Sequence, residues 1–160
     1  MMLALGDAIA VALMKARGFE REHFSRLHPG GRLGAQMARV GALMHGGDDL
    51  PLIGAGESMG DTLLVMTSKS LGIALVTDAE GRLAGVVTDG DLRRNMDGLM
   101  TRTAGEVATR EPVSVSADAL AAEALGLMND RKISALPVID GDGRPVGVLH
   151  VHDCLRVGVI

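Results

Sequence analysis

The sequence predicts an α+β fold in which two tandem repeats pack together as one pseudo-symmetric module. Two observations support this prediction. Residues 76–94 and 138–156 align without gaps at a shift of about 62 residues. Each copy also carries the pattern helix, strand, strand, helix. Because 47% of the 160 residues are hydrophobic, the chain can bury a core.

The aligned repeats share residues with special backbone or charge roles. The register also extends upstream, where Leu63 and Met66 meet Leu125 and Met128. The main matches pair Val76, Asp78, Gly81, Arg82, Gly85, Val86, Asp91 and Arg94 with Val138, Asp140, Gly143, Arg144, Gly147, Val148, Asp153 and Arg156.

The chain divides into residues 1–40, which belong to neither repeat, a first repeat at 41–100 and a second at 101–160. A helix is predicted from Gly6 to Gly18, followed by a charged and also helical segment from Phe19 to Leu27 and a turn at residues 28–31. The apolar first helix has no partner in the sequence, so we interpret it as the remnant of a larger domain. A two-helix arm packed on the repeats is the alternative.

Within each repeat, the first helix is expected after a cap at Ser58 or Asp118. Hairpin turns are expected at residues 78–81 and 140–143, and a second short helix starts from Asp91 or Asp153. The expected strands are Ile73 to Val76, Ala84 to Val87, Ala135 to Ile139 and Val146 to Leu149. Each repeat has only about 55 residues, so the two should pack their sheets together and leave clefts between them.

Composition argues against several classes of partner. With a net charge of −4 and only Phe19 and Phe24 as aromatics, the chain offers neither a basic surface nor a stacking platform for nucleic acid. Its longest apolar stretch, Ile9 to Met14, is too short to cross a membrane. The single cysteine, Cys154, fits a reducing compartment, and we expect the cytoplasm.

The first repeat places a hydroxyl and a carboxylate, Thr88 and Asp91, where a strand runs into a helix. There the backbone N–H groups and Thr88 could meet a phosphate, Asp91 could accept from ribose hydroxyls, and Gly90 would let a ligand approach closely. The alternative is an ordinary helix cap. The recurrence of the acid as Asp153 favours the binding site.

The second repeat has His150 and His152 in the corresponding segment. We predict hydrogen bonds from them to an anionic ligand or a neighbouring subunit, which should weaken as pH rises through the histidine pKa. No third strong metal ligand lies nearby in sequence, so no metal is expected. Cations near the cleft ends are Arg93, Arg94, Arg110, Arg131, Lys132 and Arg156.

The residues predicted to bind a ligand combine these groups with aliphatic neighbours that could sandwich a base. They are Ile73, Ala74, Thr88, Asp89, Asp91, Arg110, Ala135, Leu136, Pro137, His150, His152 and Asp153. No nucleophile elbow, phosphate-binding loop or cysteine cluster appears in the repeats, which favours a binding module over an enzyme. A structural oligomerisation module with empty clefts and a metal-assisted enzyme using His150, His152 and Asp153 are the alternatives.

The segments 85–92 and 147–153 resemble a pair of CBS domains, a Bateman module. The segments 4–13, 16–19, 28–31, 33–34 and 43–45 resemble the junction of the arabinose 5-phosphate isomerase family, in which a sugar isomerase (SIS) domain leads into two CBS domains.

This resemblance implies a parent enzyme that interconverts ribulose 5-phosphate and arabinose 5-phosphate for Kdo and lipopolysaccharide synthesis. His28 would be a candidate active-site histidine of that enzyme. This chain, which lacks most of the SIS domain, is not expected to isomerise sugars alone.

The resemblance also implies a regulatory role and particular partners. We expect a nucleotide-type ligand, CMP-Kdo or an adenine nucleotide, and no required cofactor. The CBS pattern has Ser or Thr where this sequence has His150, and this difference puts adenine-nucleotide binding at the site of the second repeat in doubt. The other expected partners are the chain's own SIS domain and a second copy, giving a homodimer of CBS pairs or a tetramer of the full-length protein.

Overall fold

The structure, a computed structural model, describes residues 2–17 and 37–159. Helix α1 spans Met2–Ala16 and so begins before the predicted Gly6. The apolar side chains of Leu5, Ile9 and Leu13 on this helix are exposed. The predictions for Phe19–Leu27 and for the turn that contains His28 lie outside the described residues.

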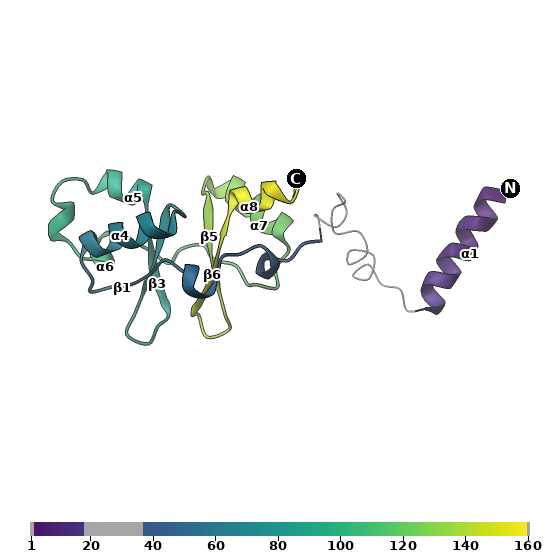
Figure 1. The fold of residues 1–160 in the computed structure, drawn as a ribbon, viewed down its shortest axis with the longest axis horizontal. Helices are drawn as coiled ribbons and strands as arrows, with labels where there is room; N and C mark the ends of the chain where they lie inside the picture. Colours follow the sequence, from purple (N-terminus) through teal and green to yellow (C-terminus); the bar gives the residue numbers. More distant parts are fainter. Residues whose placement is uncertain (1, 18–36, 160) are drawn as a thin grey trace.

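The first unit, residues 52–110, is a mixed sheet with helices on its outer side (Figure 1). Its sheet order is β1-β2-β3-β4, with β1 parallel to β2 and the other pairs antiparallel. Its elements are β1 Leu52–Gly54, α4 Met59–Lys69, β2 Ile73–Thr77, β3 Leu83–Thr88, α5 Asp89–Arg94, the 3-10 helix η3 Leu99–Thr101, α6 Ala104–Val107 and β4 Thr109–Arg110.

The second unit, residues 115–159, repeats this plan with a two-stranded sheet. Residues 37–49, which include the 3-10 helices η1 Val40–Ala42 and η2 Gly47–Asp49, precede the first unit in the chain. The elements of the second unit are α7 Ala121–Arg131, β5 Ala135–Ile139, β6 Pro145–His150 and α8 Val151–Arg156. The α+β fold of two repeats is therefore confirmed.

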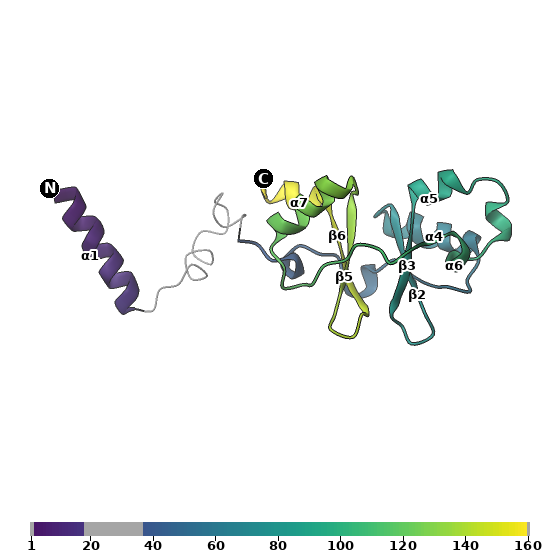
Figure 2. The same ribbon diagram turned by 180° about the vertical axis from the view of Figure 1, so that it is seen from behind.

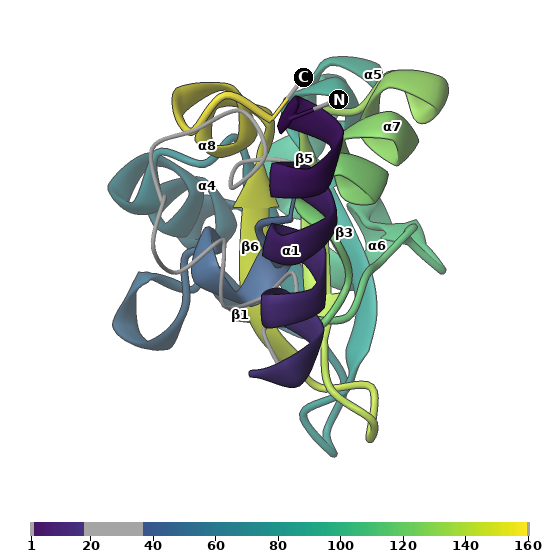
Figure 3. The same ribbon diagram turned by 90° about the vertical axis from the view of Figure 1, so that its right-hand side faces the viewer.

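The pairing register of the two hairpins shows the pseudo-symmetry directly. Ile73 pairs with Thr88 in the first unit, and Ala135 pairs with His150 in the second, each shifted by 62 residues (135 − 73 and 150 − 88). Both hairpin turns reach the same end of the molecule (Figure 3). In each turn, the first aspartate, Asp78 or Asp140, accepts two backbone N–H groups, as expected for an aspartate-capped turn.

The caps of the first helices differ between the units. Ser58 accepts from the N–H of Asp61 at 3.1 Å, so the predicted cap of α4 is confirmed. Asp118 is not the cap of α7, because that helix starts later and has Leu120 as its N-cap. The carbonyl of Asp118 instead accepts a hydrogen bond from Arg39.

The sheets of the two units face each other, and the helices lie on the outer sides (Figure 2). Alternation along β2 sends Ile73 and Leu75 toward the other unit, where they share an apolar cluster with Val86 and Val148. Ala74 and Val76 point the other way, into the core under the helices. This shared cluster joins the two small units into one module.

A close approach of β4 to β3 requires glycine at position 85. A Cβ there would lie 2.9 Å from the carbonyl oxygen of Thr109 and 3.0 Å from the Cβ of Ala108. We therefore expect Gly85→Ala to lower the free energy of unfolding by about 1–3 kcal/mol, through overpacking against backbone. Urea unfolding measures this change.

Gly126→Ala is the matched control, because Gly126 lies within helix α7 and a Cβ there meets nothing within 4 Å. This substitution should raise the free energy of unfolding by about 0.5–1 kcal/mol. Equal effects of the two substitutions would contradict the close packing of β4 on β3.

Candidate functional site

Thr88 and Asp91 form a capping box at the start of α5. The hydroxyl of Thr88 accepts from the N–H of Asp91 at 3.4 Å, and Asp91 Oδ2 accepts from the N–H of Thr88 at 2.9 Å. The capping interpretation of these residues is therefore correct. It does not exclude ligand binding, since both residues also line a cleft.

The carboxylate of Asp91 is buried and hydrogen-bonded on both oxygens, with a residual exposure of 3%. Oδ2 also accepts the hydroxyl of Thr88 at 2.6 Å, while Oδ1 accepts the hydroxyl of Thr109 at 2.8 Å and Nη2 of Arg94 at 2.7 Å. Burial alone would raise the pKa of Asp91, but the hydrogen bonds from Thr88, Thr109 and Arg94 outweigh burial and lower it. Asp91 is therefore ionised throughout the neutral range.

This lowered pKa predicts acid sensitivity. The unfolded carboxyl titrates near pH ~3.9, so the stabilisation that Asp91 provides is present above that pH and is lost as pH falls through the lower folded-state pKa. The midpoint of urea unfolding should therefore fall as pH drops below about 4. Asp91→Ala should flatten this part of the pH profile, and an unchanged slope would contradict the assignment.

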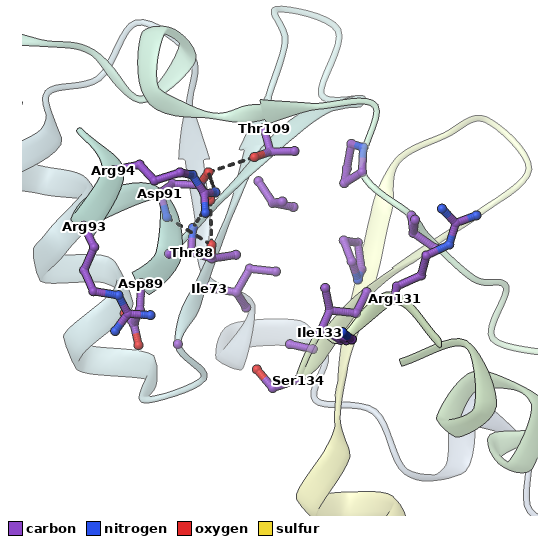
Figure 4. A pocket seen from close by; sticks show the side chains of 18 of the residues that line it. Ile73, Thr88, Asp89, Asp91, Arg93, Arg94, Thr109, Arg131, Ile133 and Ser134 are labelled. Atoms are coloured by element: carbon purple, nitrogen blue, oxygen red, sulfur yellow. Dashed lines mark hydrogen bonds and ion pairs between the residues drawn. The ribbon is translucent and has the colours of Figure 1, made fainter. Parts of the chain in front are cut away.

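Both units contribute walls to the cleft in front of Asp91, which has a volume of about 600 Å³ (Figure 4). Thr88, Asp91 and Arg94 lie on one wall, and Arg131, Ile133 and Ser134 face them from the second unit. The remaining lining residues are Gly72, Ile73, Val86, Asp89, Gly90, Arg93, Thr109, Glu111, Pro112, Val113, Lys132, Ala135 and Pro137. The volume suits a nucleotide-sized ligand.

The cleft combines cations with an aliphatic middle. The lining includes four cations, Arg93, Arg94, Arg131 and Lys132, and three acids, Asp89, Asp91 and Glu111. Because the carboxylate of Asp91 already pairs with Arg94 at 2.7 Å, the other cations remain to attract an anionic group. Helix α5 has only six residues, so we ascribe this attraction to side chains rather than to a helix dipole.

The cleft contains only part of the predicted ligand-binding set. Ile73, Thr88, Asp89, Asp91, Ala135 and Pro137 line it. Ala74 and Leu136 are fully buried in the helix-facing cores, because neighbouring residues of a strand point to opposite faces. Arg110 lies exposed on β4, between the lining residues Thr109 and Glu111.

The remaining predicted residues lie at the pseudo-symmetric position of the second unit. Asp153 is buried and accepts from Nε2 of His45 at 2.9 Å and from Nη2 of Arg156 at 3.2 Å. Nδ1 of His150 accepts from the N–H of His152 at 3.2 Å, so His150 caps α8 as Thr88 caps α5. Within residues 2–17 and 37–159, no group of three His, Cys, Asp or Glu side chains could hold a metal ion.

The environment of His150 changes the expected pH dependence. Burial lowers the pKa of His150, as do the charges of His152 and His45, and these effects outweigh the opposite influence of Asp153. Any contact of the protonated ring with an anion should therefore be lost at a lower pH than for an ordinary histidine.

Sequence reasoning missed two residues that contact the buried acids, Thr109 and His45. The structure shows them to be equivalent, since Thr109 bridges to Val86 and His45 bridges to Val148, 62 residues further along (148 − 86). Each lies on a segment that enters from outside the aligned repeat. No local pattern in the sequence marks such a contact.

None of the described helices has both the length and the apolar composition needed to span a bilayer.

Comparison with known proteins provides a family context for this geometry. The sequence model of the CBS domain matches residues 40–98 and 104–159. Arabinose 5-phosphate isomerase KdsD of Pseudomonas aeruginosa is 50% identical over 162 aligned residues, which cover 99% of this chain and 50% of the relative. The chain thus spans about half the length of the curated relatives it matches.

Two solved structures add ligand information about similar proteins. CBSX2 of Arabidopsis thaliana, solved in complex with AMP, is 26% identical with a TM-score of 0.66 over 76% of this chain and 96% of CBSX2. The cytosolic domain of the Mg²⁺ channel MgtE, solved in complex with ATP, is 26% identical with a TM-score of 0.65 over 79% of this chain and 52% of that one.

Proposed function

Because this chain belongs to the CBS domain family and both of its repeats match, we propose that it is a regulatory module that binds a nucleotide-type ligand between its two units. The observation that carries the proposal is the cleft that Asp91, with its buried carboxylate, lines together with Arg131 and Ile133 of the other unit. The complexes of CBSX2 with AMP and of MgtE with ATP support a nucleotide as the ligand.

The groups of the cleft match the parts of a nucleotide. Asp91 and Thr88 are suited to ribose hydroxyls, and the arginines and Lys132 to phosphate. Among the residues that the structure describes, no aromatic side chain lines the cleft, so the base would lie between aliphatic residues such as Ile73, Ile133 and Pro137. The proposed ligands are therefore CMP-Kdo, which also carries a carboxylate, and adenine nucleotides.

The relatives suggest what the module regulates. We propose that the full-length protein isomerises arabinose 5-phosphate and ribulose 5-phosphate for Kdo and lipopolysaccharide synthesis, and that this chain senses a ligand without catalysing the reaction. The exposed apolar residues of α1, among them Leu5, Ile9 and Val11, support the interpretation of this helix as the end of the preceding SIS domain.

The same proposal places the chain in the cytoplasm, where nucleotides are made and thiols stay reduced. Burial and the nearby charge of Asp153 raise the pKa of the Cys154 thiol, so this single cysteine is poorly reactive.

Calorimetric titration of the chain with CMP-Kdo, AMP and ATP tests the ligand proposal. We expect saturable binding of at least one of them and an increase in melting temperature with ligand concentration. Absence of heat and of any thermal shift with all three would contradict a nucleotide sensor and favour the alternative, a structural oligomerisation module without ligand.

We also propose that two copies associate into a homodimer of CBS pairs, with a tetramer formed by the full-length protein. The large apolar side chains of Leu64, Met96 and Met100 on the first unit are exposed and support an interface there. Sedimentation velocity should show a dimer that Met100→Glu weakens. A monomer at all concentrations would contradict this proposal.

A further inference from the structure

Both oxygens of the Asp91 carboxylate already have hydrogen-bond donors. Oδ2 accepts the N–H and the hydroxyl of Thr88, and Oδ1 accepts Thr109 Oγ1 and Arg94 Nη2, at distances from 2.6 to 2.9 Å. A carboxylate has about four acceptor positions in total. A ribose hydroxyl can therefore bind Asp91 only if one of these donors leaves.

The donors differ in how firmly they are held. Thr88 and Thr109 lie on β3 and β4, whose backbones are paired in the sheet. Arg94 is the last residue of α5, and its side chain is 67% exposed. An ion pair with so exposed a partner contributes little stability, so Arg94 is the donor that leaves at the lowest cost.

The guanidinium of Arg94 lies on the path by which a ligand would reach the Asp91 carboxylate. Arg94 lines the cleft, and its Nη1 lies 3.2 Å from the point where a Cβ on Gly90 would stand. The guanidinium therefore covers the backbone at Gly90 beside the carboxylate. A ligand hydroxyl that reaches Asp91 must pass this group.

We propose that Arg94 exchanges partners when a ligand binds: its guanidinium leaves the Asp91 carboxylate to a ligand hydroxyl and pairs with an anionic group of the same ligand. This inference rests on the proposed nucleotide site and specifies the ligand class. Only a molecule that has both vicinal hydroxyls and a phosphate or carboxylate restores a partner to each residue. A hydroxyl replaces Arg94 as the donor to Asp91, and the anionic group replaces Asp91 as the partner of Arg94. A nucleoside without phosphate displaces the guanidinium and leaves it without a partner.

The second unit shows the contrast. Among the residues that the structure describes, Asp153 accepts from His45 and Arg156 side chains only, so it keeps acceptor positions for a ligand. The exchange is therefore specific to the first unit.

The test compares AMP with adenosine on the whole chain by calorimetry. Arg94→Ala should tighten adenosine binding several-fold, because the competing donor is gone. It should weaken AMP binding about tenfold, because the lost charge-assisted contact to phosphate outweighs the relief from the same competition. The ratio of the AMP affinity to the adenosine affinity should therefore fall sharply. Thermal melting checks that the variant is folded.

Arg93→Ala is the matched control, because this neighbouring arginine also lines the cleft but is not a donor to Asp91 among the described contacts. It should weaken AMP binding and leave adenosine binding unchanged. Equal weakening of both ligands by Arg94→Ala, or unchanged adenosine binding, would overturn the exchange while leaving the nucleotide site standing. If the unaltered chain binds none of AMP, adenosine and CMP-Kdo, the proposed function and the exchange fail together.

Discussion

Replacing Leu75 with alanine is expected to lower the free energy of unfolding by about 3 kcal/mol and the melting temperature by roughly 10 °C. Leu75 is fully buried in the apolar cluster that joins β2 and β3 of the first unit to Val148 of the second. The substitution should also weaken ligand binding, since a cavity at this junction would shift one wall of the cleft against the other. Differential scanning calorimetry measures the stability and titration measures the affinity.

Leu155→Ala provides the control, because this leucine on α8 is 52% exposed. Its effect should stay within about 0.5 kcal/mol. If Leu75→Ala were as mild, the two units would not depend on their shared cluster, and the cleft would not be a fixed feature of the fold.

Replacing Asp91 with alanine is expected to cost about 3 kcal/mol of stability and to abolish ligand binding in the cleft in front of this residue. The loss leaves the N–H and hydroxyl of Thr88 and the hydroxyl of Thr109 without their buried acceptor. Chemical unfolding at neutral pH measures the first effect and calorimetry the second.

Asp89→Ala removes the same charge from the neighbouring residue of the same cleft, where the side chain is exposed. It should leave stability within about 0.5 kcal/mol of the original value. A ligand affinity that survives Asp91→Ala at full strength would show that the carboxylate is not part of the binding site.

The repeat and its hairpins could be predicted from the sequence because local chemistry determines them. Asp78 and Asp140 make the same turn contacts, and Gly81 and Gly143 take positive φ angles of 79° and 77°. The short strands β1 and β4 could not be predicted, because three and two residues carry no periodic signal and only their neighbours in the sheet define them.

The two buried aspartates of the candidate site could be predicted from the sequence, but the residues that line the cleft could be predicted only in part. Asp91 and Asp153 follow from the repeated strand-to-helix junction, and both are buried as that position requires. Ala74 and Leu136 illustrate the limit: they are apolar residues of the predicted strands, but their side chains face the helices. Thr109 and His45 reach the acids only because segments outside the aligned stretches 76–94 and 138–156 pack beside these stretches.

Amide NMR spectra of the isotope-labelled chain, recorded during a titration with AMP and with CMP-Kdo, test the central claim most directly. We predict that one of these ligands moves the signals of Thr88, Gly90 and Asp91 together with those of Ser134 and Ala135 across the cleft. Signals that stay fixed at both walls with every ligand, or that move only on surfaces away from the cleft, would contradict it.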